Sequence, residues 1–368
     1  MPANYLAGLQ NKRLNEIVIP GSHDAGIYGK GKKNIVTQSL NIAQQAMVGV
    51  RWYDLRIATM KTSTGAFEQR SFHLTSPLVI GKKKDHQNVD HFGGWGSDTL
   101  GKMLTQAKDF VKAYSTEFLI LKFSKSYNLQ GVVDACVEVL GEYQYKRLSK
   151  ANLNLMRVGD LAGKVITLFD EKDIAKLNLP IGDDRYLGIK KYRELYDSDT
   201  KTSKVYDKTF DGLQYFGKYS NTPEVDVNTK KQNDILQAGA MGADRDAMGM
   251  MYWTLTGTGK HLTVFRSIKS RDKGLWTNNS VQSLNETWEN GLMQAIRAQM
   301  GRDFQYAIEH RRNKFKIGGG GTWKAFMPNI VMMDFADEKK CETILELNTI
   351  ANTQINNYVN MFMQDGLL

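Results

Sequence analysis

The sequence predicts an α/β protein built as a distorted (β/α)8 TIM-like barrel, and three observations lead to that prediction. Short apolar runs recur along the chain, and several of the stretches between them have helical periodicity. The runs are nearly continuous in apolar residues, as expected for parallel strands that are covered on both faces. There are eight such runs, which is the number of strands in a closed barrel of this type.

The expected strands lie, in order, at residues 16–20, 50–58, 67–74, 118–124, 164–170, 213–220, 248–256 and 329–337. Residues 98–114 and 131–143 carry apolar residues three and four positions apart, which predicts helices between strands. The connections 171–212 and 257–328 are longer than simple crossovers, so we expect them to be insertions in one domain that spans 1–368. An amphipathic helix is expected from residue 341 onward.

Composition limits the classes of protein that fit. The formal net charge of +10 favours an anionic partner, which could be nucleic acid, an anionic membrane surface or a phosphorylated substrate. Nucleic acid is the weakest of these, because there is no recognisable motif and the lysines are dispersed. No apolar run has the length of a transmembrane segment. The two cysteines, Cys136 and Cys341, lie in apolar-periodic stretches and are expected to be buried free thiols.

The remaining general expectations concern assembly and location. We expect a monomer that needs no cofactor. The first residues, MPANYLAGLQNKRLNE, lack the basic start and apolar centre of a secretory signal peptide. The compartment therefore stays open, and it includes secretion by a route without a readable signal peptide, followed by peripheral action on membranes.

Polar and charged residues stand at the ends of the expected strands, where buried strands would otherwise be apolar. In a (β/α) barrel the carboxyl ends of all strands meet at one rim, and the chemistry gathers there. A buried charge without a partner costs several kcal/mol, so these residues should satisfy one another. The candidates for this rim are His23, Asp24, Asp54, Arg56, His73, Lys122, Asp170 and Asp334.

This set contains the groups that phosphoryl transfer requires. One histidine can activate a nucleophile, the other can protonate a leaving oxygen, and a guanidinium can hold the phosphoryl oxygens. Each residue alone has an ordinary explanation: a histidine at a strand end is more often structural, and Asp334 could cap a helix. Their occurrence on four separate strands favours a site.

Five stretches resemble the bacterial phosphatidylinositol-specific phospholipase C family. They are IPGSHDAG (19–26), GVRWYDLRI (49–57), FHLTSP (72–77), TEFLILKFS (116–124) and NIVMMDF (329–335). The resemblance implies a distorted (β/α) barrel. It also implies a reaction in which the inositol 2-hydroxyl attacks its own phosphodiester at a membrane surface, which releases diacylglycerol and a cyclic inositol phosphate.

The resemblance also implies roles for individual residues. His23 would be the general base, oriented by Asp334, and His73 the general acid. Arg56 would stabilise the phosphorane, and Asp24 would bridge Arg56 and the attacking hydroxyl. Asp54 and Lys122 match positions that line the inositol and phosphate pocket, and Asp170 stands where the family commonly has a basic residue that contacts the inositol.

Metal use follows from the same comparison. Calcium-dependent relatives place acidic ligands where this sequence has Asp54 and Arg56, so the guanidinium would replace the cation, and we predict no metal. Two alternatives stay open. One is a phosphodiesterase on the same barrel with a different headgroup, such as a glycerophosphodiester, sphingomyelin or a glycolipid anchor. The other is a lipid-binding toxin module without catalysis.

Overall fold

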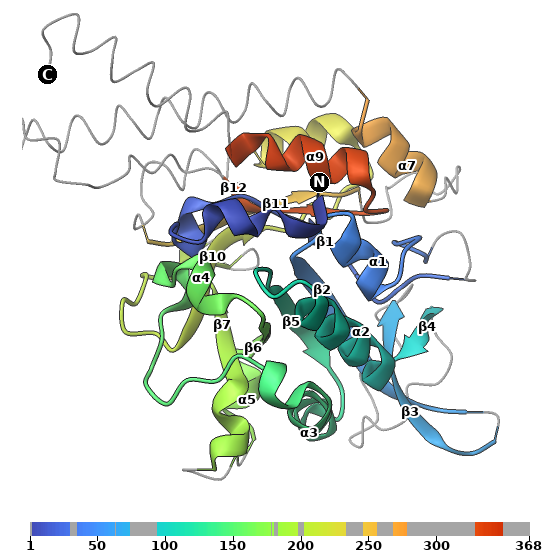
Figure 1. Cartoon of the computed structure of the whole chain (residues 1–368). Coiled ribbons are helices and arrows are strands. Elements are labelled where there is room, and N and C mark those ends of the chain that lie inside the picture. Colours follow the sequence, from blue (N-terminus) through green and yellow to red (C-terminus); the bar gives the residue numbers. More distant parts are fainter. Residues whose placement is uncertain are drawn as a thin grey trace, which may run out of the picture.

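The fold is known from a computed structural model of the chain. It describes residues 2–29, 35–62, 64–73, 94–177, 179, 183–197, 202–232, 246–255, 268–277 and 328–348. Most of the connection 257–328, and the part of the expected C-terminal helix after residue 348, lie outside these residues. Figure 1 shows the strands gathered at the centre, with helices on their outer side.

Eight parallel strands close into a barrel, as the sequence predicts. The sheet order is β1, β12, β11, β10, β7, β6, β5, β2, and β1 also pairs with β2, which closes the ring. Their bounds are β1 (Ile19–Ser22), β2 (Trp52–Lys61), β5 (Leu119–Ser126), β6 (Val165–Asp170), β7 (Ile189–Glu194), β10 (Gly212–Lys218), β11 (Met248–Trp253) and β12 (Pro328–Met333).

Two assignments of strands to the barrel were wrong. Residues 67–74 were expected to form the third barrel strand, but β3 (Phe67–His73) pairs antiparallel with β2 and carries β4 (Gly94–Thr99) on its other edge. The missing barrel strand is β7, which lies inside the segment 171–212 that was expected to be an insertion. β7 reads IKKYRE, and its polar residues hide the strand pattern.

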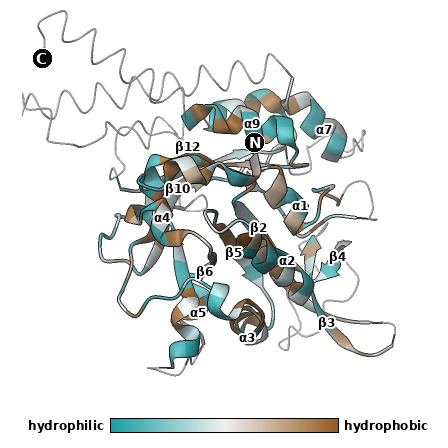
Figure 2. Cartoon of the chain, viewed as in Figure 1, coloured by the Kyte–Doolittle hydropathy of each residue, from teal (hydrophilic) through white to brown (hydrophobic). Residues whose placement is uncertain are grey.

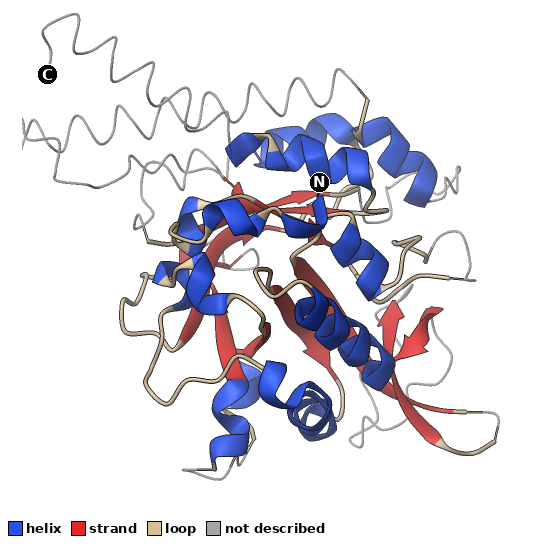
Figure 3. Ribbon diagram, in the orientation of Figure 1, coloured by secondary structure: helices blue, strands red, loops and turns tan. Residues whose placement is uncertain are grey.

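Helices cover the outer face of the barrel (Figure 3). They are α1 (Ile42–Met47), α2 (Leu100–Ala113), α3 (Leu129–Leu140), α4 (Val158–Leu161), α5 (Glu171–Ile174), α7 (Ile268–Leu275) and α9 (Glu338–Leu345). Helices α2 and α3 confirm the two predicted from periodicity. Figure 2 shows apolar and polar residues side by side along α2, whose buried residues include Met103, Leu104 and Phe110. Cys136 and Cys341 are buried free thiols, as expected.

The alternation of side chains along each barrel strand determines what reaches the interior. One apolar cluster fills the inside of the barrel, and every barrel strand contributes to it, for example Ile19, Trp52, Ile120, Ile166, Tyr192, Leu213, Met250 and Met332. A second cluster lies between strands and helices and includes Tyr53, Leu55, Leu121 and Met333. Since successive side chains point to opposite faces, residues two or four positions after an inward residue also point inward.

A buried ion pair ties the N-terminal segment to the barrel. Arg51, in the GVRWYDLRI stretch, donates from Nε and Nη2 to Glu117 Oε2 at 2.8 and 2.6 Å. Arg51 also donates to the carbonyl of Ala3, and Glu117 Oε1 accepts from the Leu6 N–H. Arg51 therefore has a structural role.

Candidate active site

Strand alternation places most of the predicted site residues in the barrel mouth. Asp54 and Arg56 follow the inward Trp52 by two and four residues, and Lys122 follows the inward Ile120 by two. In the same way Asp334, directly after β12, follows the inward Met332 by two residues. Because all barrel strands are parallel, these side chains converge on the carboxyl-terminal rim.

His23 forms a buried pair with Asp334. Its Nδ1 lies 2.9 Å from Asp334 Oδ1, although the two residues are 311 positions apart in the sequence. The parallel pairing of β1 with β12 brings them together, since Ser22 is in register with Met333. With a proton on Nδ1, this N–H donates to the carboxylate and leaves Nε2 able to accept another proton.

Asp24 lies between the other charged groups of the site. Its Oδ2 is 3.6 Å from His23 Nε2 and 3.5 Å from His73 Nε2, and its Oδ1 is 2.9 Å from Arg56 Nε. The Asp24 side chain is fully buried, whereas His73 and Arg56 are 18% and 19% exposed. Asp24 has a φ of 43°, a left-handed conformation that Asp tolerates better than most residues and that turns the chain out of β1.

These contacts shift the protonation equilibria in opposite directions. Burial by itself would lower the pKa of His23, but the carboxylates of Asp24 and Asp334 outweigh it, and the pKa lies above its usual value. Burial lowers the pKa of His73, and Arg56 adds to this effect, so that the attraction of Asp24 does not compensate. Burial would raise the pKa of Asp24, but Arg56 and both histidines hold it below its usual value.

Lys122 and Asp54 form a second group, deeper in the mouth. Lys122 Nζ lies 3.7 Å from Asp54 Oδ1 and 3.5 Å from Glu194 Oε1, over the rings of Tyr192 and Tyr215. Burial would lower the pKa of Lys122, but Asp54 and its other neighbours hold it well above the usual value. Lys122 is therefore a permanent cation with an acidic neighbour on each side.

The structure gives Asp170 a local contact that the sequence analysis did not include. Its Oδ1 accepts from the Lys172 N–H at 2.8 Å and caps α5. Burial and the nearby Asp173 and Glu194 raise its pKa, while the Lys172 N–H opposes this. Its part in substrate binding stays a prediction.

Two residues of the site were missed in the sequence. Tyr219 directly follows β10, and its hydroxyl lies 3.3 Å from His23 Nε2. The signal was present, since Tyr219 places a hydroxyl near the end of an apolar run, but it was taken as part of the strand. Glu194 ends β7, and its carboxylate accepts a hydrogen bond from the Tyr215 hydroxyl. It was missed because β7 was not recognised as a barrel strand.

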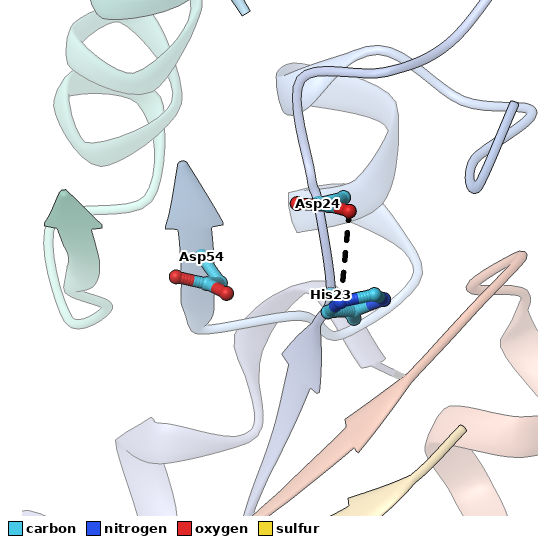
Figure 4. A group of neighbouring side chains, drawn as sticks. All are labelled: His23, Asp24 and Asp54. Atoms are coloured by element: carbon cyan, nitrogen blue, oxygen red, sulfur yellow. Dashed lines mark ion pairs between the residues drawn. The ribbon is translucent and has the colours of Figure 1, made fainter. Parts of the chain in front are cut away.

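Three of these residues bring potential metal-ligand atoms close together. One ligand atom each from His23, Asp24 and Asp54 lies within 4.8 Å of the others (Figure 4). The Arg56 guanidinium already lies against one Asp24 oxygen, so a cation bound by that carboxylate would stand close to a positive charge. Calcium also prefers six to eight oxygen ligands. The geometry thus favours arginine as the cation of the site.

Fold and site together define a (β/α) barrel protein whose carboxyl-terminal rim carries two histidines, an arginine and several carboxylates. A comparison with protein-family models finds no match. The chain is 29% identical over 158 residues to a 1-phosphatidylinositol phosphodiesterase of Staphylococcus aureus, which covers 41% of this chain and 44% of that protein. It is 23% identical over 193 residues to a PI-PLC X-box domain-containing protein of Dictyostelium discoideum, covering 46% and 22%.

Solved structures agree on the fold. The phosphatidylinositol-specific phospholipase C of Listeria monocytogenes matches with a TM-score of 0.51 and 16% identity, over 94% of this chain and 98% of that one. A mutant of the Staphylococcus aureus enzyme matches with a TM-score of 0.56 and 16% identity, over 93% and 97%. The sequence match spans less than half the length of these curated relatives. The chain shares the barrel fold of these solved structures, and less than half of its sequence is similar to the curated relatives.

Proposed function

We propose that this protein cleaves phosphatidylinositol-type lipids as a metal-independent phospholipase C. The observation that carries the proposal is the position of Asp24, whose carboxylate contacts both imidazole Nε2 atoms and the guanidinium of Arg56. This arrangement places two proton-transfer groups around one cation, as an in-line displacement at phosphorus requires. The similarity to bacterial phosphatidylinositol phosphodiesterases supports the same chemistry.

The proposed reaction needs no group beyond the side chains of the site. His23 Nε2 takes the proton of the attacking headgroup hydroxyl, while Asp334 holds the Nδ1 proton and stabilises the resulting imidazolium. The hydroxyl oxygen bonds to phosphorus, and the bond from phosphorus to the glycerol oxygen breaks. His73 gives its proton to that oxygen, and Arg56 neutralises charge on the phosphoryl oxygens. The products are diacylglycerol and a cyclic phosphate.

The pKa directions make the productive protonation state a minority form in the free protein. Catalysis needs His23 neutral and His73 protonated, whereas the pKa of His23 is raised and that of His73 lowered. A bound phosphodiester adds a negative charge beside Arg56 and so favours a protonated His73. Substrate binding would thereby help to set up the acid.

The headgroup pocket supports a second candidate. Lys122 is flanked by Asp54 and Glu194, and Asp170 stands where the resembling family commonly has a basic residue. The deeper part of the mouth is therefore more acidic than the headgroup pocket expected for that family. Carboxylates accept hydrogen bonds from sugar hydroxyls, which suits unmodified inositol, but they also suit other polyol headgroups or a glycolipid anchor. The alternative is thus the same cleavage with a different headgroup.

Strand geometry supports a proposal for the side that faces the lipid. β2 pairs with β5 as far as Ile57, and its last residues pair only with β3, so the β2–β3 hairpin extends roughly 14 Å beyond the rim. Arg56 and His73 lie at the base of this hairpin, and Phe67 lies near its tip, 56% exposed. In the described residues no helix is suited by length and apolarity to crossing a bilayer. Because the hairpin carries the exposed Phe67 beyond the rim that holds Arg56 and His73, we expect this rim to contact the lipid surface.

A panel of defined phospholipids in vesicles tests the proposal. Release of diacylglycerol from phosphatidylinositol, unaffected by a strong chelator, is the expected result. Activity that disappears with chelator and returns with calcium would contradict the metal-independent mechanism. Cleavage confined to another headgroup would favour the second candidate. Binding without cleavage, unchanged in His23→Ala, would show a lipid-binding module.

A further inference from the structure

Thr37 and Gln38 lie between the two turns that carry His23, Asp24 and Asp334, and neither belongs to the site described above. Both residues are fully buried. They precede α1 in the chain, but their polar groups are directed to the ends of β1 and β12 and not to the helix. A buried polar side chain needs hydrogen-bond partners, so the identity of those partners is informative.

The Gln38 side chain makes three hydrogen bonds across the two turns. Its Nε2 donates to the carbonyl of His23 at 2.9 Å and to the carbonyl of Met333 at 3.2 Å. Its Oε1 accepts from the Ala336 N–H at 2.9 Å. One amide therefore fixes the backbone of His23 and the backbone on both sides of Asp334.

Thr37 repeats the connection one residue earlier. Its Oγ1 donates to the carbonyl of Asp24 at 3.0 Å, and its own carbonyl accepts from the Phe335 N–H at 2.7 Å. Phe335 has a φ of 46°, so the turn that holds Asp334 is a left-handed one that needs support. Lys340 adds to this support, since its Nζ donates to the carbonyls of Asp334 and Phe335.

We propose that Gln38 is a positioning residue, which holds the backbone of His23 and that of Asp334 at the spacing their side-chain hydrogen bond requires. The 2.9 Å contact of the pair depends on the spacing of two turns that are 311 residues apart in the sequence. Direct backbone contact between them is limited to one bond at this point, from the His23 N–H to the Met333 carbonyl at 3.0 Å. The catalytic part of this inference rests on the proposed function.

The chain offers a matched control at the other end of β12. Asn329 is also buried, and its Nδ2 donates to the carbonyls of Asn15 and Ile17 while its Oδ1 accepts from the Gly249 N–H. It makes the same three kinds of bond as Gln38, but at the amino-terminal end of the barrel. Removing either amide leaves buried backbone groups without partners, so both changes should reduce stability to a similar extent.

The experiment compares Gln38→Met with Asn329→Leu in the full chain. NMR titration of the His23 imidazole, assigned with His23→Gln, needs no substrate and so does not depend on the proposed function. We expect the pKa of His23 to fall in Gln38→Met and to be unchanged in Asn329→Leu. On lipid substrate, kcat should fall on the order of tenfold or more in Gln38→Met with KM little changed, because small displacements at a catalytic pair are costly.

Gln38→Asn provides a second variant if Gln38→Met does not fold. Its side chain is uncharged and still polar, but it is one methylene shorter, so its amide cannot span the His23 and Met333 carbonyls and the Ala336 N–H together. It should show the same fall in the pKa of His23. An unchanged His23 titration in the folded Gln38 variants, or an equal shift in Asn329→Leu, would overturn the inference. Absence of any lipid cleavage by the unmodified protein, with the titration shift present, would instead contradict the proposed function alone.

Discussion

Asp24 determines how the charges of the site are arranged, because its two oxygens contact three partners from three different strands or turns. Arg56 is on one oxygen, and the two histidines face the other. A buried carboxylate in this position costs free energy unless it is paired, and here it is paired with a cation that cannot lose its proton. Asp24 thus orients the guanidinium and keeps both imidazole rings close to the same carboxylate oxygen.

Asp334 gives a prediction for the pH dependence of the reaction. It raises the pKa of His23, so Asp334→Asn should lower that pKa. Activity is lost as pH rises through the higher of the two pKa values and as pH falls through the lower one. With the pKa of His23 raised and that of His73 lowered, the alkaline limb belongs to His23 and the acid limb to His73.

The expected result for Asp334→Asn is therefore an alkaline limb displaced to lower pH, together with a fall in rate of roughly two orders of magnitude or more. The measurement is kcat/KM as a function of pH on a short-chain soluble lipid. The two histidines interact, so the limbs report the pair and should be compared between variants. An alkaline limb that stays in place would show that Asp334 does not act on His23.

That these residues lie together at one rim could be predicted from the sequence, because charged residues at the ends of apolar strands are unusual; the roles that the resemblance assigned to them stay predictions. The distances between their side chains could not be predicted, because the His23–Asp334 contact depends on the register of β1 with β12. Tyr219 and Glu194 were missed for a local reason. A tyrosine ending an apolar run reads as part of the strand, and Lys190, Lys191 and Arg193 mask the alternation in β7.

At the level of the elements, the position of His73 was predicted for the wrong reason. It was expected at the end of a barrel strand, but β3 is an antiparallel strand outside the ring. His73 still reaches the site because β3 runs back toward the rim and ends beside Arg56. Sequence alternation cannot distinguish a hairpin strand from a barrel strand, because both have one face against the core.

The turn after β1 packs tightly against β3 and β4, which makes Gly26 a sensitive position. A Cβ on Gly26 would lie 1.8 Å from Ser71 Oγ, and a Cβ on Gly96 would lie 2.0 Å from the Gly26 carbonyl oxygen. We expect Gly26→Ala to displace β3, and with it His73, and to cost about 1–3 kcal/mol of unfolding free energy.

Denaturant unfolding and lipid cleavage would measure the two effects of Gly26→Ala. The double variant Gly26→Ala with Ser71→Gly removes both close contacts with Ser71, and it should recover part of the activity. Equal activity in the single and double variants would show that the contact with Ser71 does not position His73.

For the whole molecule, the two ends of the barrel should differ in their contact with lipid. The tip of the β2–β3 hairpin has an uncharged exposed stretch from Thr64 to Phe67 beyond the rim that carries the site. Leu148 is more exposed, at 83%, but it lies between residues that bridge to the first residues of β6 and β10, at the opposite end. A comparison of variants at Phe67 and at Leu148 therefore distinguishes docking through the rim from a general effect of exposed apolar side chains.

Phe67→Ser should weaken binding to vesicles of phosphatidylcholine and phosphatidylinositol on the order of tenfold, because one large apolar side chain loses its burial in the bilayer. Leu148→Ser should leave binding unchanged. Cleavage of a soluble short-chain lipid should be the same in both variants. Vesicle sedimentation measures the binding, and equal weakening by the two changes would contradict docking through the hairpin.

The central claim, that His23 and His73 are the base and acid of an intramolecular phosphoryl transfer, is tested most directly by identifying the phosphorus-containing product. Phosphorus NMR of phosphatidylinositol vesicles incubated with the protein should show a cyclic inositol phosphate. The signal should be absent with His23→Ala and with His73→Ala. Phosphatidic acid as the product, or undiminished cyclic phosphate in either variant, would contradict the mechanism.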